Sequence, residues 1–232
     1  MMTVASPIHE NFEKITQQIR LLEKKYKREP HSVSLLAASK GQSIERIHTA
    51  IECGQKIFGE NYVQEAIIKM DIIKNPNVEW HFIGVPQSNK TKYMAELFSW
   101  VHTVCDRKVV QRLSDQRPKE LAPLQICIEV NISHETSKSG ITDIYSLKDL
   151  AQFCKTLPGI CLRGLMTVPA PSPNLESQRA EFRKLFNLQQ KLIESGFELD
   201  TLSMGMTDDM EAAIAEGSTI VRIGRGLLGE RL

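Results

Sequence analysis

The sequence has no excess of charge of either sign, no long apolar run and no leader-like start. Its 29 lysines and arginines are balanced by 28 aspartates and glutamates, for a formal net charge of +1. Because no basic excess is present to neutralise phosphate backbones, we do not expect a general nucleic-acid binder. No segment approaches the ~20 consecutive apolar residues of a membrane span, and the charged stretch 1–29 lacks a signal-peptide core.

Cysteine and histidine lack the spacings that disulfide or metal chemistry requires. The five cysteines stand far apart with no C-x-x-C pair, and the six histidines show no metal-ligand spacing on one helix or strand. We therefore interpret the cysteines as small buried hydrophobes in a reducing compartment, and we expect a cytoplasmic protein without a metal.

Hydrophobic residues (41%) and charged residues (25%) are in globular proportion, and they alternate as short apolar runs and amphipathic stretches. The apolar runs predict strands at 33–39, 56–60, 79–84, 100–104, 124–132, 160–168, 201–206 and 218–224. The stretches between them predict helices at 43–53, 61–73, 89–98, 106–116, 146–156, 176–195 and 209–216.

Eight strands separated by helices indicate repeated βα units, at about 29 residues per unit. An N-terminal helix over about 7–28, capped by Ser6 and with Pro7 at its first position, presents one apolar stripe formed by Ile8, Phe12, Ile15, Ile19 and Leu22. We expect it to cover the gap left because no helix follows the eighth strand. An open doubly wound sheet would carry a G-x-G-x-x-G turn after strand one, which is absent. The prediction is one α/β domain over 1–232, a (β/α)8 TIM barrel with an extra N-terminal helix.

Barrels carry their chemistry at the carboxyl ends of their strands. Lys40 ends the first apolar run, where desolvation would favour the neutral amine that attacks a carbonyl; a lysine reaching past the strand end to solvent is the alternative. We expect Gly205 and Gly224–Gly226, on the far side of the barrel, to form a phosphate cradle with hydroxyls from Ser203 and Thr207.

Arg222 interrupts the last apolar run, and a guanidinium inside a barrel needs an acceptor. Its partner is either a structural carboxylate, Glu129 or Glu60, or a ligand atom. An amine, a phosphate cradle and a buried arginine together match an aldehyde-bearing phosphorylated heteroaromatic, pyridoxal 5′-phosphate.

These motifs occur together in one known family. The sequence resembles the YggS/PROSC family of pyridoxal phosphate homeostasis proteins, relatives of the alanine racemase barrel, over nearly its whole length. The resemblance rests on LLAASK (35–40), FGENYVQE (58–65), WHFIG (80–84), VNIS (130–133), SKSGI (137–141), RGLMTVP (163–169), MGMT (204–207) and GSTIVRIG (217–224). Three positions depart from the family pattern: Pro86 stands where leucine is usual, Thr207 where serine is usual, and Arg225 lies in an altered tail.

The resemblance implies a fold type III pyridoxal phosphate site. It implies that Lys40 forms the Schiff base, that Arg222 faces the pyridine nitrogen, and that Asn61 and His81 line the cofactor; His81 could equally be a hydrogen-bonded histidine of the barrel interior. The phosphate would be held by Ser203, Gly205, Met206, Thr207 and Gly224.

The family role is intracellular cofactor homeostasis without robust amino-acid turnover. An arginine cannot readily protonate the ring nitrogen, since its pKa exceeds ~12, and the chain offers no second domain to supply a further acid or base. We therefore expect a non-enzymatic, monomeric carrier whose partners are pyridoxal phosphate and apo forms of the enzymes that use it. A low-activity racemase and a Schiff-base aldolase are the alternatives.

Overall fold

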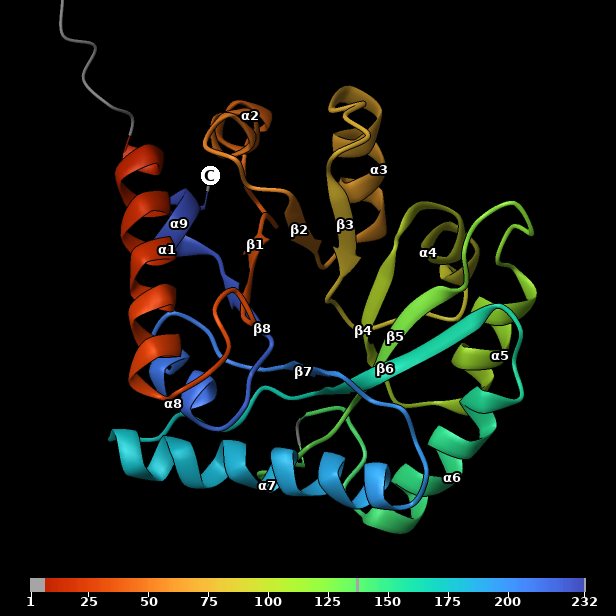
Figure 1. Ribbon diagram of the computed structural model, residues 1–232. Coiled ribbons are helices and arrows are strands. Elements are labelled where there is room, and N and C mark those ends of the chain that lie inside the picture. Colours follow the sequence, from red (N-terminus) through yellow and green to blue (C-terminus); the bar gives the residue numbers. More distant parts are fainter. Residues whose placement is uncertain (1–6, 137, 232) are drawn as a thin grey trace, which may run out of the picture.

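Eight parallel strands close into a barrel surrounded by helices (Figure 1). The computed structural model describes residues 7–136 and 138–231. The strands are β1 (Ser34–Ala38), β2 (Ile57–Glu60), β3 (Glu79–Phe82), β4 (Trp100–Val104), β5 (Leu124–Glu129), β6 (Ile160–Met166), β7 (Thr201–Ser203) and β8 (Ile220–Ile223). The helices of this part of the chain are α1 (Pro7–Lys25), α2 (Ile44–Glu52), α3 (Val63–Ile72), α4 (Thr91–Leu97), α5 (Arg107–Asp115), α6 (Ile144–Lys155), α7 (Leu175–Glu194), α8 (Met210–Ala215) and α9 (Arg225–Leu228).

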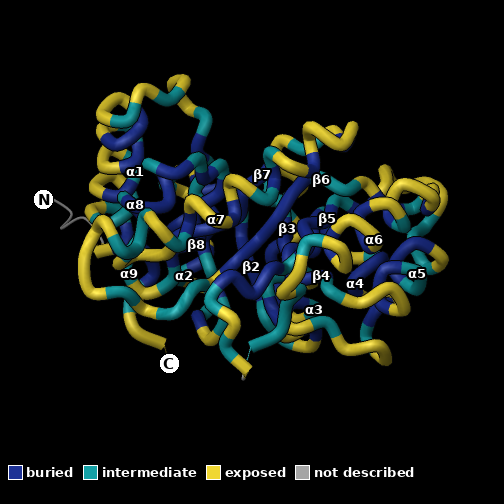
Figure 2. Tube along the Cα trace, turned by 90° about the horizontal axis from the view of Figure 1, so that it is seen from below, coloured by how far each residue is buried: buried dark blue, intermediate teal, exposed yellow. Residues whose placement is uncertain are grey.

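The strand order confirms the predicted (β/α)8 barrel. Each strand pairs in parallel with the next, and β8 pairs with β1 along Ser34–Ala37 to close the sheet. Both faces of such a sheet are covered, which explains why the strands are near-continuous apolar runs rather than alternating ones. Figure 2 shows the strands buried at the centre, with exposed positions on the loops and the outer faces of the helices.

Side-chain caps start several helices at the end of the barrel where the strands finish. Ser43, Asp106, Asp143 and Asn174 each accept backbone N–H groups at the start of α2, α5, α6 and α7. Asp143 accepts from both Tyr145 and Ser146, so α6 begins at Ile144, two residues before the predicted start.

The N-terminal helix confirms the predicted apolar stripe. Ile8, Ile15, Ile19 and Leu22 are buried and Phe12 packs against the core. In Figure 1 the helix runs beside α8 and α9, and it also contacts α2, so it covers the predicted gap. It ends at Lys25 rather than 28, because Lys27 adopts left-handed backbone with φ 53°. The predicted cap Ser6 lies outside the described residues.

The expectation that no helix follows the last strand was wrong. Gly224 leads directly into the short helix α9, where the Gly224 carbonyl accepts the N–H groups of Leu227 and Leu228. Both leucine side chains are buried, and α9 packs against α1. Burial of the two leucines thus stabilises a helix of four residues, which is too short to show a helical period in the sequence.

Two of the cysteines fit their interpretation as buried hydrophobes, and one does not. Cys127 and Cys154 are buried, and burial raises the pKa of Cys154 to about 12, whereas Cys161 is exposed. Within residues 7–136 and 138–231, no group of three His, Cys, Asp or Glu side chains could hold a metal ion. No helix in the described part of the chain is long and apolar enough to cross a membrane.

Candidate functional site

Lys40 lies two residues beyond β1, at the mouth of the barrel, and is half-buried. Burial lowers the pKa of its ammonium group, and the nearby positive charge of Arg231 lowers it further, against the opposing fields of Glu60 and Glu65. Both lowering effects disfavour the charged form. The environment of Lys40 therefore favours the neutral, nucleophilic amine more than open solvent would.

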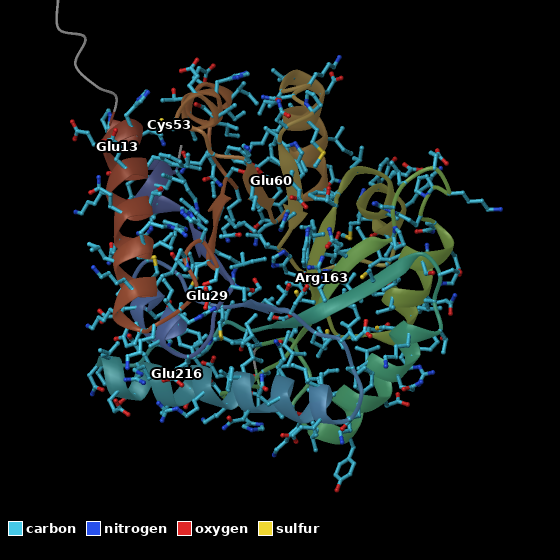
Figure 3. All side chains as sticks on the ribbon, in the orientation of Figure 1. Glu13, Glu29, Cys53, Glu60, Arg163 and Glu216 are labelled. Atoms are coloured by element: carbon cyan, nitrogen blue, oxygen red, sulfur yellow. The ribbon has the colours of Figure 1, made fainter. Side chains whose placement is uncertain are left out.

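A buried ion cluster fixes the backbone just before Lys40. The Nζ of Lys69 donates to Glu60 Oε1 at 2.7 Å, to Glu65 Oε1 at 2.6 Å and to the Ser39 carbonyl at 2.6 Å. The Ser39 hydroxyl donates to the same oxygen of Glu60, at 2.6 Å. Glu60, which is labelled in Figure 3, is fully buried, and burial raises its pKa.

Lys69 was not among the site residues predicted from the sequence. Its clearest sequence signal is its position four residues after Glu65 on α3, the spacing of a helical ion pair. Nothing in that spacing indicates the further bonds to β2 and to the loop that carries Lys40, because those partners come from other elements. The cluster also excludes Glu60 as the ion-pair partner of Arg222, because Glu60 pairs with Lys69.

Asn61 follows β2 and presents an unsatisfied polar atom. Its side-chain Oδ1 is buried and makes no hydrogen bond with the described residues. Gly84, after β3, packs so closely on the Asn61 backbone that a Cβ there would overlap the Asn61 carbonyl oxygen. The loops after β2 and β3 are therefore held together with an acceptor left over for a ligand.

Two glycine-containing loops meet beside these groups. Gly205 turns the chain after β7 with φ 98°, which ends the strand at Ser203 rather than at the predicted 206. A Cβ on Gly226 would lie 3.1 Å from the Thr207 hydroxyl, and one on Gly224 would lie 3.4 Å from the Ala38 carbonyl. The lack of side chains at Gly205, Gly224 and Gly226 lets the loops after β7 and β8, here called the glycine loops, pack closely beside the Thr207 hydroxyl.

Two further contacts, made by Asp209 and Arg225, involve the glycine loops. The N–H of Met206 donates to the Asp209 carboxylate at 2.5 Å, and the side chain of Met206 is 41% exposed. Arg225 is exposed and its partner is Glu230, 3.7 Å away, so it points to solvent. Gly224 lies next to the loop that carries Lys40 rather than on the far side of the barrel as predicted, because β8 pairs directly with β1.

Arg222 on β8 is buried without a carboxylate partner among the described residues. Its NH1 donates to the carbonyl and hydroxyl oxygens of Ser203 at 2.6 and 2.8 Å, and its NH2 donates to the Thr167 carbonyl at 2.9 Å. Burial lowers the pKa of Arg222 to about 10, which keeps it charged at neutral pH. The alternative of an ion pair with Glu129 or Glu60 is wrong: no salt bridge of the described residues includes Arg222, and Glu129 accepts from Ser139.

Ser203 and His81 lie deeper than the other predicted residues. The Ser203 hydroxyl is fully buried between Arg222 and His102, and His81 is 1% exposed and bonds to His102. Lys40, Asn61, Gly205, Met206, Thr207 and Gly224 instead stand in the loops beyond the strand ends. His81 thus takes the barrel-interior position that the sequence left open, and Ser203 reaches the mouth through Arg222.

Comparison with known proteins places this geometry in a family. Residues 11–231 match the model for the alanine racemase N-terminal domain. Pyridoxal phosphate homeostasis proteins of Vibrio alginolyticus and Escherichia coli are 51% and 44% identical to the chain, over 97% of it and 98% and 97% of the relatives. The chain belongs to the pyridoxal phosphate homeostasis protein family.

Solved structures agree with this membership. PipY of Synechococcus elongatus, solved with pyridoxal phosphate bound, matches with a TM-score of 0.84 at 30% identity, over 96% of this chain and 100% of PipY. An alanine racemase from Clostridium difficile matches with a TM-score of 0.73 at 13% identity and over 56% of its own length, a likeness that shows the fold alone. The pyridoxal phosphate homeostasis protein family thus shares its barrel with the racemases.

Proposed function

We propose that this protein binds pyridoxal phosphate and serves its homeostasis, holding the cofactor for use elsewhere without turning over amino acids. One observation carries the proposal: the neighbouring strands β7, β8 and β1 bring together a half-buried lysine, glycine loops with a hydroxyl and a buried guanidinium. The names of the curated relatives and the cofactor bound to PipY support it.

The residues present fit the cofactor part by part. Thr207 and the backbone at Gly205, Gly224 and Gly226 suit a phosphate, which needs donors and close approach. Lys40 supplies the primary amine, and the unsatisfied Oδ1 of Asn61 offers an acceptor at the mouth. When bound, pyridoxal phosphate supplies an aldehyde that takes such an amine and a ring that can withdraw electrons.

Arg222 favours a carrier over a catalyst. A guanidinium with a pKa of about 10 keeps its proton at neutral pH, so Arg222 would offer the ring nitrogen a hydrogen bond without protonating it. A ring nitrogen that stays unprotonated withdraws electrons weakly, so little stabilisation is available to a carbanion. Lys40, which follows the backbone held by the Lys69 ion cluster, would supply the amine that holds the aldehyde until another amine competes for it.

The proposal extends to the setting of the protein. We place it in the cytoplasm as a monomer that passes its cofactor to apo forms of pyridoxal phosphate enzymes. The buried thiols and the absence of a membrane-crossing helix in the described residues are compatible with that setting.

The deciding experiment has two readouts. Apoprotein titrated with pyridoxal phosphate should gain a visible absorption band with a saturable dissociation constant. The loaded protein, incubated with L- and D-amino acids in deuterium oxide, should then show no sustained Cα exchange by NMR. Failure to bind the cofactor would overturn the proposal, and exchange at ordinary enzyme rates, on the order of 1 s⁻¹ or faster, would replace it with the racemase alternative.

A further inference from the structure

A chain of polar side chains runs from β3 to β8; it is buried from His81 to Arg222, and its Glu79 end is 39% exposed. Arg222 NH1 lies 2.8 Å from Ser203 Oγ, which lies 2.8 Å from His102 Nδ1. His102 Nε2 lies 2.8 Å from His81 Nδ1, and His81 Nε2 lies 3.5 Å from Glu79 Oε1. The proposed function uses only the Arg222 end of this chain.

The two ends give the chain a direction. A guanidinium only donates hydrogen bonds, which fixes the order at the Arg222 end. At the far end His81 Nε2 makes no hydrogen bond with the described residues, and the negative charge of Glu79, 3.5 Å away, favours a proton on that nitrogen over a lone pair. Ser203 then accepts from Arg222 and donates to His102, and His102 donates through Nε2 to His81. In the reverse order a lone pair of His81 Nε2 would face the carboxylate, and the Ser203 proton would lose its acceptor in the chain.

The surroundings hold the far end in place. The indole N–H of Trp100 donates to Glu79 Oε1 at 2.8 Å, and the Trp100 ring stacks on His81 with centroids 5.3 Å apart. Arg163, labelled in Figure 3, lies over the same indole at 5.1 Å. His102 is fully buried and His81 is 1% exposed, and burial lowers the pKa of both, so each is neutral with one proton to give.

We propose that Glu79, His81 and His102 are positioning residues for Arg222. Because the Ser203 proton is committed to His102, the lone pairs of Ser203 are the ones that meet Arg222, and the guanidinium is held with its remaining donors turned to the barrel mouth. This role rests on the proposed function, in which Arg222 faces the ring of pyridoxal phosphate.

The experiment compares two substitutions of His102. His102→Gln keeps an acceptor for Ser203 and a donor for His81, whereas His102→Leu of similar size keeps neither. We expect His102→Leu to shift the visible absorption band of bound pyridoxal phosphate and to speed its dissociation about tenfold, the effect of losing one oriented hydrogen bond. His102→Gln should restore the wild-type band and rate, a rescue that a packing role would not produce.

The chain itself is tested without cofactor. Nitrogen-15 NMR of the apoprotein should show both histidines neutral and protonated on Nε2, and a charged or Nδ1-protonated ring at either position would overturn the inference. So would a His102→Leu protein with unchanged band and dissociation rate, or a folded His102→Gln protein as impaired as the leucine variant. Circular dichroism checks folding, and Ser203→Ala, the smallest break in the chain, replaces His102→Leu if that variant does not fold. A wild-type protein that binds no cofactor would overturn the proposed function, while the apoprotein spectrum would still decide the chain.

Discussion

At the scale of single residues, the amine of Lys40 is the group whose removal separates binding from folding. Lys40 is half-buried and its Nζ makes no hydrogen bond with the described residues that would hold the loop together. Lys40→Ala should therefore abolish the visible band and the covalent trapping of pyridoxal phosphate by borohydride, while the far-ultraviolet dichroism stays unchanged. Lys138→Ala, which removes an amine on the β5–α6 loop, is the control; a trapped adduct of wild-type yield in Lys40→Ala would assign the attachment elsewhere.

Substitution of Thr207 tests whether its hydroxyl holds the phosphate of the cofactor. One hydrogen bond to a charged group contributes about 1.5–3 kcal/mol. Thr207→Ala should therefore weaken pyridoxal phosphate binding by about 10- to 100-fold in a titration of the apoprotein. Thr156→Ala, an exposed threonine after α6, should bind like wild type. Equal affinities in all three proteins would show that the phosphate is held without this hydroxyl.

Residue types at the strand ends could be predicted from sequence, but their partners could not. Lys40, Gly205 and Thr207 were predicted because they end apolar runs or lie in glycine turns after them, which is local information, whereas Asn61 was predicted only from the family resemblance. The bond between His102 and Ser203 joins residues 101 positions apart, and that of Lys69 to Ser39 joins residues 30 apart. Such pairings follow from the closure of the barrel, which no local pattern records.

At the scale of elements, α1 is the helix whose packing can be measured most cleanly. Ile19 on this helix is fully buried, whereas Leu21 two positions later is 67% exposed. Ile19→Ala should lower the free energy of unfolding by about 2–4 kcal/mol in urea, and Leu21→Ala should stay within about 0.5 kcal/mol of wild type. Similar losses from the two substitutions would mean that α1 does not pack as described.

Element boundaries show what limited the prediction at this scale. The apolar stripe of α1 was predicted correctly because five residues repeat with helical spacing over a long segment. Its end at Lys25 depends on the left-handed backbone of Lys27, and the early end of β7 depends on the turn at Gly205. The helix α9 is too short to show a period, and it forms because α1 covers its leucines.

At the scale of the whole molecule, the free energy of unfolding at acid pH should depend on Glu79. The side chain of His81, whose Nε2 lies 3.5 Å from Glu79 Oε1, together with the Trp100 N–H and the positive charge of Arg163, lowers the pKa of Glu79 in the folded state despite partial burial. The unfolded chain then binds a proton more readily, so this contribution is complete above about pH 5 and is lost as pH falls through the folded-state pKa. The stability difference between wild type and Glu79→Gln should shrink between about pH 6 and about pH 3 in urea titrations. A difference that stays constant over this range would contradict the assignment.

The pairing of β8 with β1 has a consequence for the growing polypeptide. Residues Ser34–Ala37 pair with Ile220–Ile223, 186 positions further along the chain, and β2 reaches β1 at Ala37 and Ala38. Until Ile220–Ile223 leave the ribosome, β1 and β7 both present open edges with unpaired backbone groups, the condition under which chains associate wrongly. The same delay withholds Arg222 and Gly224 from Lys40, so the proposed site could take up pyridoxal phosphate only after β8 has been made.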